Sequence, residues 1–172
     1  TPSQSSAASD VYKRQQRIPV ALFEPVVITS EQQYRIDVLD SLADKSVGQQ
    51  HELALLYAST RAFEQSFDIL SSLAEEDPEN YDYQFMLGGI AGTLASEVSQ
   101  VKSLPYVRTM KTAFEQAARI APDSLTIQLV LLELYTELPW VLGGSNKMAN
   151  KALSAVQSLS TIEGFLAAGY YY

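Results

Sequence analysis

Residues 53–57 read Leu-Ala-Leu-Leu-Tyr, and residues 87–91, which begin 34 positions later, read Leu-Gly-Gly-Ile-Ala. In the segments around both stretches, apolar residues recur at helical spacing. A period of about 34 residues is typical of proteins built from stacked helix pairs, because one pair cannot bury its apolar face alone and packs against the next. The sequence therefore predicts an all-α solenoid of antiparallel helix pairs.

The second helix of each pair is expected to end at a proline, since proline cannot continue a helix and disfavours helical dihedrals in the residue before it. Pro78 and Pro122 both follow helical apolar patterns. Within a pair, small residues let two helices approach closely, and large residues of the facing helix fill the space. The small set is Ala54, Gly88 and Ala117, and the large set includes Tyr57, Leu70 and Phe114. The aromatic residues of this set are interpreted as core rather than as a cofactor site.

The spacing predicts about three repeats plus a truncated fourth, with units at about residues 47–80, 81–124 and 125–164. Pro78 and Pro122 are 44 residues apart, so the second unit is about ten residues longer than the usual period. We expect a lengthened first helix, a loop around Val101–Leu104, and Pro105 in the first turn of a helix that contains residues 108–120.

The third unit is also stretched. A helix capped by Ser145 or Asn146 should run to about Ser160. Residues 164–172 should form the first helix of the fourth unit, cut off before it can pair.

Residues 1–15 show neither helical nor strand periodicity and resemble translated sequencing-adapter tails, so they are interpreted as a non-native or disordered tail. Residues 16–28 are expected to be extended, and residues 29–172 to form the helical repeat domain. Thr29 or Ser30 should cap a helix from Glu31 to about Lys45. Because the chain starts at Thr1 rather than Met, we expect any leader peptide to have been lost with the true N-terminus.

The composition argues against several classes of function. The formal net charge is −8, which disfavours binding to nucleic acid or to an anionic membrane surface. There is no cysteine and one histidine, His51, which excludes thiolate sites and multi-histidine metal sites. No apolar run reaches the length of a membrane span. We expect no cofactor, no bound metal and no membrane-spanning segment.

Local features that could carry chemistry have simpler structural readings. The acidic run 75–77 is interpreted as a solvated turn rather than a pair of catalytic carboxylates. His51 is either a groove contact or an ordinary surface or partly buried residue. Gly143 and Gly144 are expected to supply positive φ angles in a structural turn that lies against its neighbour, rather than a phosphate site. The Trp140 ring is expected to pack under its loop, with an exposed ring as the alternative. The chain is therefore not expected to be an enzyme.

Several of these stretches resemble a known family. Residues 113–117 (Ala-Phe-Glu-Gln-Ala), 121–124 (Ala-Pro-Asp-Ser), Tyr135, 139–145 (Pro-Trp-Val-Leu-Gly-Gly-Ser) and 151–152 (Lys-Ala) resemble bacterial tetratricopeptide-repeat proteins of a loosely characterised, often exported group. The resemblance implies an α-solenoid that binds proteins or peptides and carries no catalytic residues. It also favours a periplasmic or envelope-associated location over a cytoplasmic one. The sequence departs from the general motif at Gln50, Ser66 and Met110.

First-helix positions that commonly face the inner groove of such arrays are the candidate site. They are His51, Leu55, Phe85, Gly89, Thr93, Leu129, Glu133, Thr136 and Glu137. Glu133 and Glu137 lie four residues apart on one helix face and are interpreted as solvated or as lining the groove.

The candidate set is apolar to mildly acidic and lacks the Lys and Asn clamp that binds a C-terminal carboxylate in related adaptors. We therefore expect a protein or peptide segment of apolar or basic character, such as a partner helix. The alternative is a small-molecule or lipid-binding subunit of an envelope transport system, which a hydrophobic cavity would favour over an open groove.

Overall fold

The structure, a computed structural model, describes residues 27–171. The predicted tail at residues 1–15 and nearly all of the predicted extended segment at 16–28 lie outside this range. The described helices are, in chain order, α2 (Ser30–Asp40), α3 (Val47–Ser59), α4 (Phe63–Glu76), α5 (Tyr81–Glu97), α6 (Gln100–Ile120), α7 (Leu125–Glu137), α8 (Asn146–Leu159) and α9 (Thr161–Tyr171), with a short 3₁₀ turn, η2 (Trp140–Leu142), before α8. Every regular element within residues 27–171 is helical.

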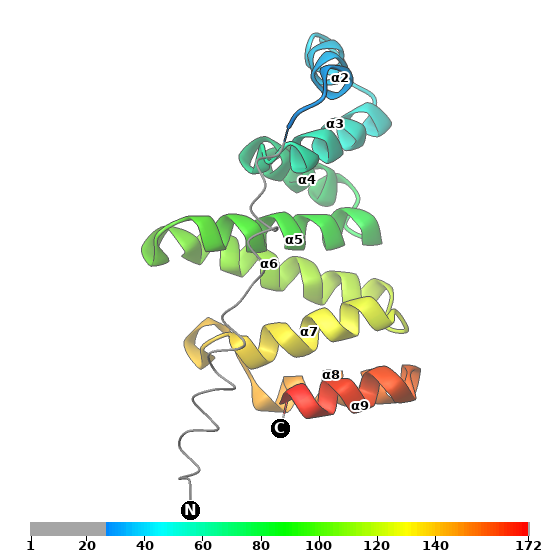
Figure 1. The fold of residues 1–172 in the computed structure, drawn as a ribbon, viewed down its shortest axis with the longest axis vertical. Helices are drawn as coiled ribbons and strands as arrows, with labels where there is room; N and C mark the ends of the chain where they lie inside the picture. The colour runs from blue at the N-terminus through cyan, green and yellow to red at the C-terminus, as the bar shows by residue number, and fades with distance from the viewer. Residues whose placement is uncertain (1–26, 172) are drawn as a thin grey trace, which may run out of the picture.

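The helices form an α-solenoid (Figure 1). Pairs α3–α4, α5–α6 and α7–α8 stack along the long axis, with α2 at one end and α9 at the other. The predicted all-α solenoid of about three pairs is confirmed, with one further helix, α9, after the third pair. The division of the chain at residues 80, 124 and 164 stays a prediction.

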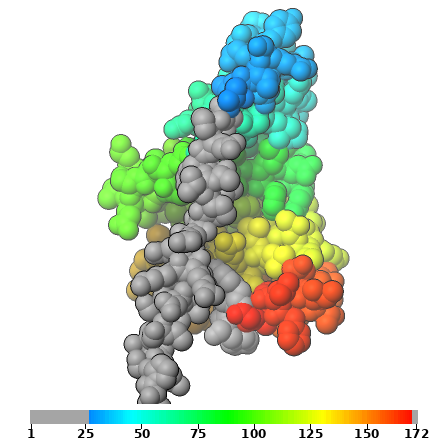
Figure 2. All heavy atoms as spheres, viewed as in Figure 1, coloured from blue at the N-terminus to red at the C-terminus, as the bar shows by residue number. Residues whose placement is uncertain are grey.

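The extra residues of the second unit lengthen both of its helices. Helices α5 and α6 have 17 and 21 residues, whereas α3 and α4 have 13 and 14. The end of α5 and the beginning of α6, which follow each other in the chain, project sideways from the stack (Figures 1 and 2). The predicted loop around Val101–Leu104 is wrong, because this stretch is the beginning of α6.

Pro105 lies inside α6 rather than in its first turn. Proline lacks the N–H that would bond the carbonyl of Val101. The Val101 side chain is 80% exposed, so this end of α6 is open to water, which can satisfy the carbonyl.

Two other helix limits differ from the prediction. Helix α2 has the expected cap at Thr29, whose side chain accepts from the backbone N–H of Gln32, but it ends at Asp40 rather than near Lys45. Helix α9 begins at Thr161 rather than at residue 164, because the Ser160 hydroxyl accepts from the backbone N–H of Glu163 and starts the helix earlier. The predicted Ser145 cap of α8 is confirmed, since its side chain accepts from Met148 N.

Small residues let the helices approach, as predicted. Ala54 and Ala117 are fully buried. A Cβ atom at Gly88 would lie 2.6 Å from Cδ1 and Cε1 of Phe114, so glycine is needed where α5 meets α6. Ser66, at a position where alanine is usual, is fully buried and donates its hydroxyl to the Ala54 carbonyl at 2.9 Å. This hydrogen bond offsets the cost of burying a polar group.

Glutamine recurs at one position of the first helices and ties each one to the turn before it. The Gln50 side-chain amide donates to the Lys45 carbonyl (3.2 Å), Gln84 to the carbonyls of Ala74 (3.2 Å) and Pro78 (3.4 Å), and Gln128 to the Pro122 carbonyl (2.9 Å). Gln50 therefore departs from the usual aromatic residue in the same way as Gln84 and Gln128 do. At each of these positions, a side-chain amide bonds carbonyls that the preceding turn leaves unpaired.

The two glycines of the loop before α8 have separate roles. Gly143 has φ of 100°, which favours glycine, and Gly144 approaches the Leu138 carbonyl so closely that a Cβ would lie 1.7 Å from its oxygen. The predicted positive φ is confirmed for Gly143 and wrong for Gly144, where the close approach to the Leu138 carbonyl, rather than the φ angle, requires glycine. The prediction for Trp140 is wrong, since its side chain is 85% exposed. The Gly144 N–H donates to the Pro139 carbonyl at 3.1 Å and closes a tight loop, and the Trp140 ring lies on the solvent side of this loop.

Candidate functional site

Two hollows flank one face of α7. The α6–α7 hollow has a volume of about 340 Å³ and is lined by Met110, Phe114, Val130, Glu133, Leu134, Glu137 and Leu138. The α7–α9 hollow has a volume of about 490 Å³ and is lined by Thr126, Leu129, Val130, Leu132, Glu133, Leu166 and Ala167. Val130 and Glu133 belong to both, so the hollows are neighbours separated by one ridge. Together they are called the α7 groove.

The structure brings three of the predicted site residues into the α7 groove. Leu129 lines the α7–α9 hollow, Glu137 lines the α6–α7 hollow, and Glu133 lines both. The carboxylates of Glu133 and Glu137 are on exposed residues. They therefore place acidic groups beside apolar walls.

The three predicted residues of the second unit, Phe85, Gly89 and Thr93, do not line either hollow of the α7 groove. Phe85 is partly buried, stacks on Tyr81 with ring centroids 5.6 Å apart, and tilts against Phe114 at 5.8 Å. This ring is largely committed to the core. Gly89 faces open space, since a Cβ there would meet nothing within 4 Å. Thr93 donates its hydroxyl to the Gly89 carbonyl of its own helix at 3.1 Å.

The remaining predicted residues do not line the α7 groove. Leu55 is 44% exposed on α3. The His51 ring is partly buried and meets the Tyr83 ring edge-on, with centroids 5.1 Å apart. Its Nε2 atom is buried with no hydrogen-bond partner among the described residues. Thr136 donates to the Leu132 carbonyl at 2.7 Å. The interpretation of His51 as a partly buried residue fits this geometry.

Helix α9 contributes residues that the sequence analysis did not single out. Ile162, Phe165 and Leu166 are 74%, 82% and 65% exposed, and Leu166 lines the α7–α9 hollow. They occupy the same helical positions as Thr126, Leu129 and Val130 of α7, 36 residues earlier. Aligning the sequence after residue 160 with the first helix of the third unit would have identified them.

The charges of the first helices have one sign. Helices α3, α5, α7 and α9 contain no Lys or Arg, whereas they contain one, two, two and one acidic residues, respectively. All the basic residues of the three helix pairs lie in α6 and α8 or in the turn before α4. A partner on the face formed by the first helices therefore meets apolar and acidic groups.

The acidic run 75–77 is exposed on its turn, as predicted. Within residues 27–171 no cluster of three or more His, Asp or Glu side chains has the arrangement of a metal site. No helix in the part of the chain that the structure describes has both the length and the apolar character needed to cross a membrane.

Comparison with known proteins gives a match in fold. No protein-family model matches the chain, and no curated protein shows significant similarity to it. A solved structure, MamA MSR-1 C2, aligns with a TM-score of 0.60 and 16% sequence identity, over 95% of this chain and 85% of that one. MamA contains tetratricopeptide repeats. At this identity the likeness establishes the architecture, a tetratricopeptide-like α-solenoid, and leaves the ligand to be argued from the site.

Proposed function

We propose that the chain is a non-catalytic scaffold that binds a protein segment in the α7 groove. The observation that carries the proposal is the pair of adjoining apolar hollows that share Val130 and Glu133. A tetratricopeptide-like fold supports a protein partner, because stacked repeats form extended concave binding surfaces. The Pro139–Ser145 loop further supports membership of the bacterial, often exported group that it resembles.

The chemistry of the groove favours an amphipathic helix with basic residues. Apolar side chains spaced along one face of a helix can enter neighbouring hollows, which is how helix-in-groove recognition works. Burying one large aliphatic anchor contributes about 1.5–3 kcal/mol. A Lys or Arg opposite Glu133 contributes only about 0–1 kcal/mol at an exposed site. The apolar anchors therefore supply affinity, and the carboxylates supply orientation and selectivity.

A peptide selection tests the proposal without a known partner. A phage-displayed library of short amphipathic helices is selected against the chain, and the enriched peptides are titrated by fluorescence anisotropy. Leu166→Asp should weaken binding about tenfold or more, because it removes an apolar wall of the α7–α9 hollow. Its side chain is 65% exposed, so the fold should be unaffected.

The charge preference has its own matched pair of variants. Glu133→Lys should weaken basic peptides, while Glu64→Lys, the same change on an exposed residue of α4, should not. If the selected peptides bind Leu166→Asp and Glu133→Lys as tightly as they bind the native chain, the α7 groove is not the binding surface.

A further inference from the structure

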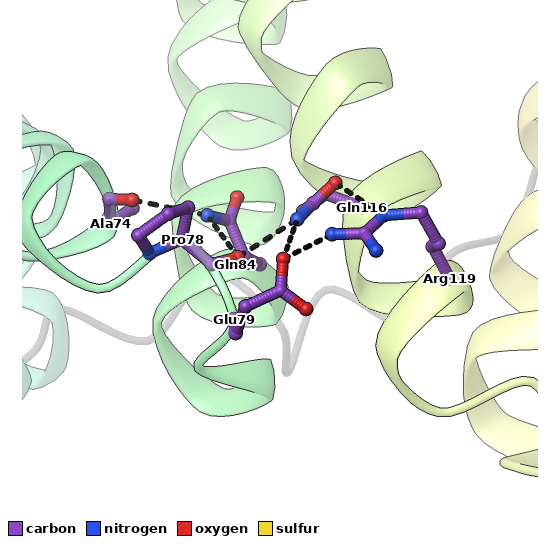
Figure 3. Close-up of polar contacts among 6 residues, drawn as sticks. All are labelled: Ala74, Pro78, Glu79, Gln84, Gln116 and Arg119. Carbon is purple, nitrogen blue, oxygen red and sulfur yellow. Dashed lines mark hydrogen bonds and ion pairs between the residues drawn. The ribbon is translucent and has the colours of Figure 1, made fainter.

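The junction between the first and second helix pairs is closed by side chains of α6 (Figure 3). The Gln116 amide donates to the Pro78 carbonyl at 2.9 Å and to Glu79 Oε1 at 3.3 Å. Arg119 forms an ion pair with the same Glu79 carboxylate. These contacts cross from α6 to the turn after α4, and they fill the outer gap between the two pairs.

The next junction lacks these closing side chains. The buried core residues Phe114 and Ala117 of α6 correspond to Leu153 and Val156 of α8, 39 positions later. The same shift places Ala155 where the first junction has Gln116, and Ser158 where it has Arg119. Neither side chain is long enough to reach back to the turn at Pro122.

An open pocket results between α6, α7 and α8, here called the α8 pocket. Its volume is about 510 Å³, and Ala155 is one of its lining residues. Leu131, Met148 and Ala152 give it apolar walls. It lies on the opposite side of α7 from the α7 groove, because Leu131 and Tyr135 point away from Glu133 around the helix. The volume is within the usual range for small-molecule sites, about 300–1,000 Å³.

Three charged side chains line the α8 pocket. Arg119 and Lys151 line it, together with Glu115. Glu115 Oε1 already accepts hydrogen bonds from Lys111 Nζ at 2.8 Å and from the Tyr135 hydroxyl at 2.6 Å. Burial, reinforced by the hydrogen bond to Glu115, raises the pKa of Tyr135 and keeps its proton in place. Arg119 is already paired with Glu79, and Glu115 with Lys111, so these pairs leave the charge of Lys151 unbalanced. In a chain of net charge −8, an unbalanced cation beside an apolar pocket favours an anionic group.

We propose that the α8 pocket binds a small amphiphile that has an apolar body and one anionic group, such as a carboxylate or sulfonate. The apolar body lies against Leu131, Met148 and Ala152, and the anionic group lies near Lys151. This site is separate from the α7 groove and does not depend on the peptide-binding proposal.

Two fluorescent probes test the site and its charge preference. One is 8-anilinonaphthalene-1-sulfonate, and the other is the uncharged N-phenyl-1-naphthylamine. Ala155→Gln restores the residue that closes the first junction, so it should weaken both probes about tenfold or more. Its thermal midpoint should not fall, because the added amide can bond the Pro122 turn as Gln116 bonds the Pro78 turn. The loss of probe binding would then not be due to unfolding.

The charge variants complete the test. Lys151→Gln should weaken the sulfonate probe about threefold or more and leave the uncharged probe unchanged. Lys147→Gln, on an exposed residue of α8 that does not line the pocket, should change neither. The proposal is wrong if the native chain shows no saturable probe binding, or if Ala155→Gln binds both probes as the native chain does. Equal effects of Lys151→Gln on the two probes would overturn the anionic assignment.

Discussion

Gly88 and Gly89 are neighbours in α5 and allow a matched test of the close helix approach. A Cβ at Gly88 would lie 2.6 Å from two ring carbons of Phe114 on α6, whereas a Cβ at Gly89 would meet nothing within 4 Å. Replacing either glycine by alanine makes the same chemical change in the same helix. Any difference in stability between the two variants therefore measures the contact with Phe114.

The expected magnitudes follow from two opposing terms. Glycine to alanine within a helix stabilises by about 0.5–1 kcal/mol. Gly89→Ala should gain this in full, which raises the unfolding midpoint by about 1–4 °C for a chain of this size. Gly88→Ala has the same gain but must displace the Phe114 ring, which is 8% exposed and held by Phe85. Overpacking of a core costs about 1–3 kcal/mol. We expect Gly88→Ala to be less stable than Gly89→Ala by that amount.

Urea unfolding followed by circular dichroism measures the difference, with the two variants compared at the same pH and protein concentration. The double variant Gly88→Ala/Phe114→Leu supplies a further check, because a smaller side chain at 114 should relieve the clash and make the two changes non-additive. The reasoning about this interface fails if Gly88→Ala is as stable as Gly89→Ala.

Two further predictions concern single aromatic residues. Trp140 is the only tryptophan and is 85% exposed, so its fluorescence should be that of a solvated indole and acrylamide should quench it readily; a shielded, blue-shifted emission would mean that the ring packs under its loop after all. Burial and the hydrogen bond to Glu115 raise the pKa of Tyr135 in the folded state. The protonated side chain therefore contributes fully to the free energy of unfolding below the ordinary tyrosine pKa of about 10, and this contribution is lost as the pH rises through the pKa of the folded state. Tyr135→Phe should accordingly flatten the fall of the urea midpoint above about pH 10, and an unaltered pH dependence would contradict this assignment.

The sequence by itself determined the features that depend on local chain chemistry. Helical periodicity and the 34-residue repeat identified the solenoid, and Pro78 and Pro122 marked helix ends, since these signals follow from backbone geometry within one helix or turn and from the repeat of one helix pair. Caps at Thr29 and Ser145 could be predicted because a cap involves only residues three positions apart. The predicted ends of helices were less accurate where a local signal for a helix start lies inside a longer helix. Pro105 indicated a helix start, yet α6 begins earlier.

Only the tertiary structure decided which surfaces stay open. The exposure of Trp140, the α9 residues that extend the α7 groove, and the α8 pocket all depend on what a neighbouring helix does or does not cover. The contrast between Gln116 and Ala155 is plain in the sequence, but its consequence is not. A side chain closes a gap only if the facing turn lies within its reach, and that distance is set by packing between units far apart in the chain.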